Sequence, residues 1–121
     1  MARYMLLIYG DERQWGTFSP EEQAQEFKLY DEYTDWLREK GWYLAGEPLH
    51  PTAAATSVQV RDGKTLTTDG PFAETKEQLG GYYLVQVESL DEAIGAASRI
   101  PAARGGTIEV RPIFETERMT P

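Results

Sequence analysis

Cysteine is absent from this chain of 121 residues, and histidine occurs only once. The lack of thiols excludes disulfides, thiolate metal sites and cysteine nucleophiles. One histidine, without the carboxylate spacing of a recognised metal loop, also argues against a metal centre. We therefore expect no metal and no other cofactor. The lack of cysteine fits a reducing compartment.

Long hydrophobic runs and clusters of positive charge are missing as well. The apolar run in residues 3–9 is too short to span a membrane, and no small-residue cleavage site follows it. The net charge is −8, from 12 basic and 20 acidic residues. Nucleic acids and anionic membranes are bound largely through Lys and Arg, so we expect neither as a partner. These features predict a cytoplasmic protein.

The composition predicts one folded domain over residues 1–121. Hydrophobic residues make up 40% of the chain and aromatic residues 12%, which is typical of a globule with a core. Two helices have clear start signals. Ser19, Pro20 and Glu22 form a capping box that opens a helix running to about Lys40. The second helix opens with the same pattern, from Ser89 to Glu92, and ends before Pro101.

Short apolar segments between these helices predict strands. The Asp62-Gly63 pair is a favoured hairpin turn and lies between two of them. The predicted order is β-α-β, then a hairpin, then β-α-β. This order predicts an α+β fold of the ferredoxin-like, split βαβ type with an added β-hairpin. The six expected strands cover residues 3–9, 42–49, 56–61, 64–68, 81–88 and 107–114.

The first predicted helix carries more apolar surface than one sheet can cover. Its apolar side chains span roughly half of the circumference, whereas a helix lying on a sheet needs a stripe of roughly 100°. Leu29 and Trp36 form the excess edge. Either the loop at residues 14–18 or a partner subunit could cover them, and the pattern leaves both options open.

The last two long strands each have one purely apolar face and one mixed face. In residues 107–114, Ile108, Val110 and Phe114 share the apolar face. The apolar faces belong under the helices. The mixed faces would be exposed in a monomer, or would line a small-molecule cleft where two sheets pack face to face in a homodimer. The polar members of the mixed faces include Tyr82, Gln86, Glu109 and Arg111.

The segment TDGPFAETKE, residues 68–77, is the most informative stretch of the chain. Asp-Gly-Pro is turn chemistry, and Gly70 allows a positive φ there. The next five residues carry a phenyl ring, two carboxylates, a hydroxyl and an ammonium, which is more specific chemistry than a connector needs. We interpret Phe72 as a core plug that pins the loop. Glu74 is expected to turn inward with it, and both are candidate substrate contacts. We interpret Lys76 and Glu77 as solvated loop residues, with Glu77 pairing with Lys76 or Lys64.

Four further residues are candidates for chemistry, and each has a structural alternative. Asp69 could be a general base or substrate anchor, or it could cap the turn. His50 could shuttle protons, or it could be a solvated loop residue. Arg111 could clamp an anionic substrate, or it could pair with a nearby glutamate. Tyr82 lies beside Arg111 on the mixed faces and is a candidate substrate contact.

Three segments carry a resemblance to a known family. They are DGPFAETKEQLGGYYLVQVESLDEAI, IEVRPI near the end and YMLLIYGDE near the start. The chain resembles the DGPF-type branch of the YCII-related domain family over nearly its whole length. The resemblance implies a ferredoxin-like domain that dimerises into an α/β barrel. It also implies a mostly unassigned function. Members are often encoded beside extracytoplasmic-function sigma factors, and others have been proposed as enzymes that use a His–Asp pair.

The chain departs from that family at one position. The wider pattern places a histidine on the first helix, about three turns before its closing Gly, and the matching residue here is Tyr30. The His–Asp pair is therefore incomplete. Tyr30 could donate a phenolic proton, but a pKa near ~10 makes it a poor base, and a core role is the other interpretation. The sequence thus predicts a small-molecule-binding domain with cofactor-free acid–base chemistry as its candidate activity. The alternative is a non-catalytic regulatory or interaction module linked to sigma-factor-dependent transcription.

Overall fold

A four-stranded antiparallel sheet forms the body of the protein. The computed structural model describes residues 1–116. Strand order is β2-β5-β1-β6, and each neighbouring pair is antiparallel. This order is compatible with the ferredoxin-like arrangement, and the described chain closes no barrel. The strands are β1 (Ala2–Gly10), β2 (Tyr43–Pro48), β5 (Gln78–Val87) and β6 (Thr107–Pro112).

The last strand is shorter than its sequence predicts. It ends at Pro112, and Phe114 is exposed instead of lying under the helices. Beyond Pro112, the Ile113 amide still donates to the Arg3 carbonyl of β1, and the Glu115 carboxylate accepts from the Arg3 guanidinium. The placement of Phe114 on the apolar face was therefore wrong, because the ladder ends before that residue.

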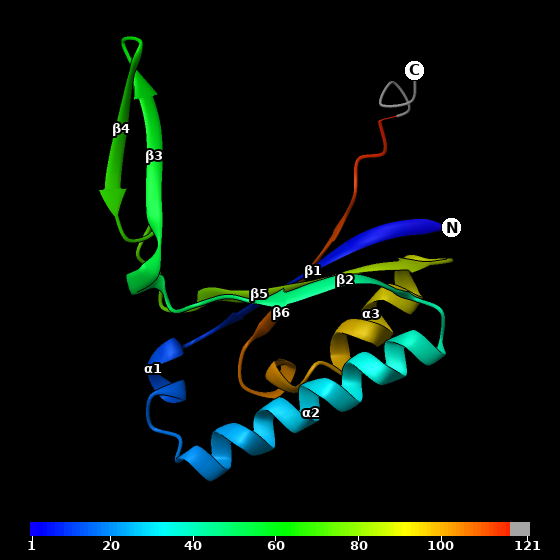
Figure 1. Cartoon of the computed structure of the whole chain (residues 1–121). Coiled ribbons are helices and arrows are strands. Elements are labelled where there is room, and N and C mark those ends of the chain that lie inside the picture. Colours follow the sequence, from blue (N-terminus) through cyan, green and yellow to red (C-terminus); the bar gives the residue numbers. More distant parts are fainter. Residues whose placement is uncertain (117–121) are drawn as a thin grey trace.

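The helices cover one face of this sheet (Figure 1). They are α2 (Pro20–Glu39) and α3 (Leu90–Ser98), with the one-turn helix α1 (Glu12–Trp15) before them. The capping box of α2 is confirmed, since Ser19 and Glu22 bond to each other's backbone amides. Two short 3-10 turns, η1 (Thr52–Ala54) and η2 (Pro101–Arg104), complete the described elements. No helix in residues 1–116 is long and apolar enough to span a membrane.

The start of α3 differs from a reciprocal capping box. Ser89 accepts from the Glu92 amide, as predicted, but the Glu92 carboxylate accepts from the Glu88 amide instead of from Ser89. The helix still begins where the pattern placed it.

The core lies between the helices and the sheet. It consists of Leu6, Tyr33, Leu37, Tyr83, Val85, Val87, Ala93, Ala96, Ala97 and Ile100. The Tyr33 hydroxyl donates to the Ala96 carbonyl at 2.7 Å, which joins α2 to α3. Tyr83 stands edge-on to Tyr33, with ring centroids 5.1 Å apart. These two tyrosines therefore link both helices to the middle of the sheet.

The apolar edge of α2 is covered within the chain at Trp36. The Trp42 ring lies 5.7 Å from the Trp36 ring, and the Arg99 guanidinium lies 4.1 Å from its centroid. Trp15 of α1 contacts Phe27 instead, at 5.5 Å. The cover for Trp36 thus comes from segments other than residues 14–18, and this position does not require a partner subunit.

The inserted hairpin forms a separate two-stranded sheet. It consists of β3 (Thr56–Arg61) and β4 (Lys64–Asp69), and it extends away from the sheet on the side opposite the helices (Figure 1). Asp62 and Gly63 both have positive φ, 53° and 74°, as a two-residue hairpin turn requires. The predicted turn is therefore confirmed.

The sheet face that carries no helix is called the open face below. Its members alternate along the strands with the buried residues that face the helices. Leu7 lies opposite Tyr82 on one side and Glu109 on the other, while Met5 lies between Leu84 and Arg111. The open face therefore mixes apolar, acidic and basic groups, as the strand patterns predict. It consists of Met5, Leu7, Tyr9, Tyr82, Leu84, Gln86, Glu109 and Arg111.

Candidate functional site

The Asp-Gly-Pro turn fixes the base of the hairpin. Gly70 has a φ of 95°, which confirms the predicted positive value. Its amide donates to the Ala55 carbonyl at 2.7 Å, and its own carbonyl accepts from the Ser57 hydroxyl at 2.8 Å. Both ends of the hairpin are therefore held together at this glycine. Asp69 precedes it, exposed, as the last residue of β4 and opposite Thr56.

Phe72 does not plug the core. Its side chain is 91% exposed, so the interpretation of this residue as a buried pin was wrong. The loop at residues 71–77 runs from the hairpin base to the start of β5. The core, in contrast, lies beneath the helices on the other face of the sheet. The path of the loop thus never brings Phe72 over the core.

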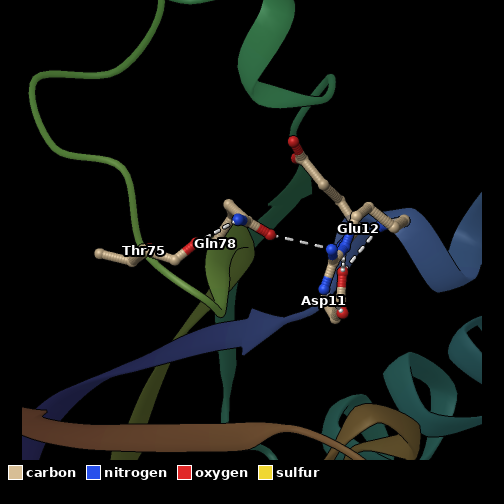
Figure 2. A network of polar contacts seen from close by, with 5 residues as sticks. Asp11, Glu12, Thr75 and Gln78 are labelled. Carbon is tan, nitrogen blue, oxygen red and sulfur yellow. Dashed lines mark hydrogen bonds and ion pairs between the residues drawn. The ribbon is translucent and has the colours of Figure 1, made fainter.

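Gln78 connects the end of this loop to helix α1. Its amide nitrogen donates to the Thr75 carbonyl, and its side-chain oxygen accepts from the Glu12 amide at 3.2 Å (Figure 2). The Glu12 carboxylate in turn accepts from the amide of Thr52, at 3.0 Å, and from its hydroxyl. One polar network therefore joins the loop, α1 and η1.

An ion pair lies beside this network. Asp11 caps α1 and accepts from the Arg13 guanidinium, with Oδ2 at 2.8 Å from Nη2. The side-chain hydrogen bond from Arg13 lowers the pKa of Asp11 to about 2, and the Lys76 charge adds a smaller effect. Asp11 is consequently a fixed negative charge near the loop at any physiological pH.

Two hollows lie on either side of the loop. The larger, of about 760 Å³, is lined by Tyr9, residues 75–77, Thr107, Ile108 and Glu109. The smaller, of about 440 Å³, is lined by Arg13, Thr52, Pro71, Ala73, Glu74, Thr75, Lys76 and Gln78. Thr75 and Lys76 contribute to both, so this dipeptide is the wall that the two hollows share.

Glu77 anchors the same loop to the far edge of the sheet. Its carboxylate accepts from the Thr107 hydroxyl on β6 at 2.9 Å. This contact differs from the pairing with a neighbouring lysine that the sequence favours for Glu77. It fixes the loop across the end of the sheet, beside the larger hollow.

The predicted site residues divide among several places. Tyr82 and Arg111 share the open face, on opposite sides of β1, and Arg111 donates to Glu109 at 2.6 Å. Glu74 lines the smaller hollow. His50 is exposed between β2 and η1, and no ion pair or hydrogen bond within residues 1–116 joins it to Asp69. In the same residues no group of His, Asp and Glu is arranged to hold a metal ion.

Tyr30 lies away from the other candidates, on the helix side of the sheet. It packs against the buried core, so it lies on the other side of the sheet from the open face. Burial, with a further effect from Glu26, raises the pKa of Tyr30 to about 12. The phenol is therefore neutral, and a structural role explains its environment.

A comparison of sequences identifies the family. The YCII-related domain matches residues 2–117. The chain belongs to the YCII-related domain family. It is also 38% identical over 112 residues to an uncharacterised protein of Rhizobium meliloti (strain 1021), a match that covers 91% of this chain and 90% of the relative. Neither match names an activity, so the site of this YCII-related domain is argued from its geometry.

Sequence reasoning about this YCII-related domain missed the residues that the hollows bring together. Lys76 was interpreted as a solvated loop residue, yet it lines both hollows. Arg13 and Thr52 join it from α1 and η1, more than twenty residues away along the chain. The only sequence signal for this site was the cluster of polar side chains in residues 74–77. No local pattern indicates which distant elements face a loop.

Proposed function

We propose that this YCII-related domain binds a small anionic molecule in the smaller hollow, beside Thr75 and Lys76. The Lys76 ammonium carries the proposal, because it lines both hollows and none of the ion pairs within residues 1–116 occupies it. Thr52, Thr75 and Gln78 add hydroxyl and amide groups to the smaller hollow. The smaller hollow also holds Arg13, which pairs with Asp11, and one carboxylate, Glu74. Lys76 can therefore bind the carboxylate or phosphate group of a small ligand there.

We further propose that the protein is a homodimer of the dimeric α/β-barrel type, with ferredoxin-like subunits. The open face supports this, since Met5, Leu7 and Leu84 are only partly buried and no helix covers them. A second sheet packed on this face would also cover the larger hollow, because Tyr9 and Glu109 belong to both surfaces. The motif at residues 69–72 supports membership of the DGPF-type branch. One domain over residues 1–121 and a cytoplasmic location remain predictions of the sequence.

Acid–base chemistry at this site stays a prediction. Asp69 and His50 are exposed and line neither hollow, so they would act only if a ligand or a second subunit reached them. Arg111 and Tyr82 could contact a ligand that extends over the open face. Of the candidate activities, binding has the stronger support, because the groups proposed for it line one hollow.

A thermal-shift screen tests the binding proposal. Small carboxylates and phosphate esters should raise the melting temperature of the wild type, because a ligand that binds only the folded state stabilises it. Lys76→Gln should abolish the shift. Lys28→Gln on the exposed surface of α2 removes the same charge outside both hollows and should preserve it. An equal shift in all three proteins would overturn the assignment of Lys76.

A non-catalytic interaction module is the second candidate, linked by family resemblance to sigma-factor-dependent transcription. The observation that favours it is Phe72, which is 91% exposed in a loop that the turn and Gln78 hold in place. An exposed aromatic ring can serve as an anchor for a protein partner. Phe72→Ala should then weaken capture of a purified sigma factor while leaving ligand-induced thermal shifts unchanged.

A further inference from the structure

The β3–β4 hairpin has a regular ladder, although its strands pack against almost nothing else in the chain. Five of the six residues of β3 and all six of β4 are exposed, yet all six residue pairs are in register. Backbone contacts with the rest of the chain are at the base, where the Gly70 amide donates to Ala55. An isolated two-stranded hairpin is marginally stable in water at best. Its strands therefore need a further surface to pack against.

One face of the hairpin suits burial better than the other. Val58 and Val60 lie side by side on β3 and are 60% and 61% exposed. They face Thr67 and Thr65 across the ladder, so four β-branched side chains form one continuous surface, called the valine face here. The opposite face carries a single large apolar side chain, Leu66, opposite Gln59. Burial of the valine face would therefore remove the most apolar surface from water.

The charge of the hairpin allows an acidic partner. Residues 56–69 hold two basic and two acidic residues, so the hairpin adds nothing to the net charge of −8. At its tip, Arg61 lies opposite Lys64, on the face that carries Leu66 and not on the valine face. The neutral strands can therefore approach a second, acidic copy of this chain without like-charge repulsion.

The direction of the hairpin identifies which surface a second copy would use. The hairpin extends from the sheet on the same side as the open face (Figure 1). A copy that covers the open face therefore also lies next to the hairpin. In a two-fold dimer the same pair of surfaces is used twice. The open face and the hairpin, which do not pack on each other within one chain, would both be buried in such a dimer.

We propose that the β3–β4 hairpin is an intersubunit arm whose valine face packs on a second copy of this chain. The inference rests on the proposed homodimer and adds to it the surface that holds the two copies together. The arm extends from the Gly70 turn, so it also places the loop that forms both hollows next to the partner copy.

Sedimentation equilibrium of the full chain tests this proposal with a matched pair of variants. Val58→Thr combined with Val60→Thr keeps the β-branch and the strand propensity but replaces a methyl group with a hydroxyl at each position. Leu66→Thr removes apolar surface from the opposite face while keeping a residue that favours strands. The double variant should weaken the dimer roughly a hundredfold, because four side chains per dimer lose apolar burial. Leu66→Thr should leave the dimer dissociation constant nearly unchanged.

Each outcome has a distinct meaning. A wild-type dimer that both variants leave intact would overturn the arm and leave the homodimer standing. A wild type that stays monomeric at high micromolar concentration would overturn both. If Leu66→Thr weakened the dimer as much as the double valine variant does, the assignment of the valine face would be wrong. If the double variant fails to fold by circular dichroism, hydrogen exchange of the wild type decides. Amides in residues 56–69 should then become protected only at concentrations at which the dimer forms.

Discussion

Replacing Gly70 with alanine tests whether the turn in the DGPF segment is under the conformational constraint that its backbone indicates. Gly70 has a φ of 95°, and a Cβ built there would meet no atom within 4 Å. The cost of Gly70→Ala therefore comes from the backbone alone and not from a clash. An L-residue in left-handed backbone loses roughly 1–2 kcal/mol. We expect the free energy of unfolding to fall by about that amount.

Gly95→Ala is the matched control, because it is the same chemical change in a different backbone. Gly95 lies within α3, without a positive φ, and a Cβ there would also meet nothing within 4 Å. Alanine should stabilise the protein at this position by roughly 0.5–1 kcal/mol, since glycine is a poor helix former. The two variants should thus shift the denaturant midpoint in opposite directions at similar slope. A Gly70→Ala variant as stable as wild type would refute the inferred constraint.

Three further outcomes follow from the core and the loop. Tyr33→Phe should lower the free energy of unfolding by about 0.5–1.5 kcal/mol in denaturant titrations, because the buried 2.7 Å bond to the Ala96 carbonyl is lost. Burial raises the pKa of Tyr30 to about 12 in the folded protein. The neutral phenol therefore contributes its full stability only below the unfolded pKa of ~10. Stability should decline as pH rises from there toward 12, and the decline should be shallower in Tyr30→Phe. Asp69→Asn should leave stability nearly unchanged, because the carboxylate is exposed; loss of ligand binding in that variant, measured by titration calorimetry, would show that its charge serves the ligand.

Local signals account for most of the elements. The Ser19 capping box and the Asp62-Gly63 turn are each decided by residues within four positions of one another. Helix α1 was missed because its four residues are too few to show a period. Phe114 was misplaced because the end of β6 depends on where β1 begins, which is information from the other end of the chain.

The site was harder to predict than the fold for a related reason. The strand alternation predicted correctly that Tyr82 and Arg111 would share a mixed face. The direction of the hairpin relative to that face could not be derived, because a turn such as Gly70 sets an exit angle that side-chain pattern does not encode. The sequence therefore left open whether Asp69 anchors a substrate or caps the turn. In the structure it lies at the base of a hairpin that leaves the sheet.

The DGPF segment divides into two parts with different physical roles. Its first half, Asp69 to Pro71, sets the backbone: the Gly70 amide and carbonyl bond to Ala55 and Ser57 and thereby fix how the hairpin leaves the body. Its last three residues, 75–77, present side chains to both hollows and are held there by the bonds of Gln78 and Glu77. A backbone-only change at Gly70 should therefore act first on stability and on the hairpin, whereas a charge change at Lys76 should act first on binding. If the two variants affected both properties equally, the segment would be a single unit and this division would be wrong.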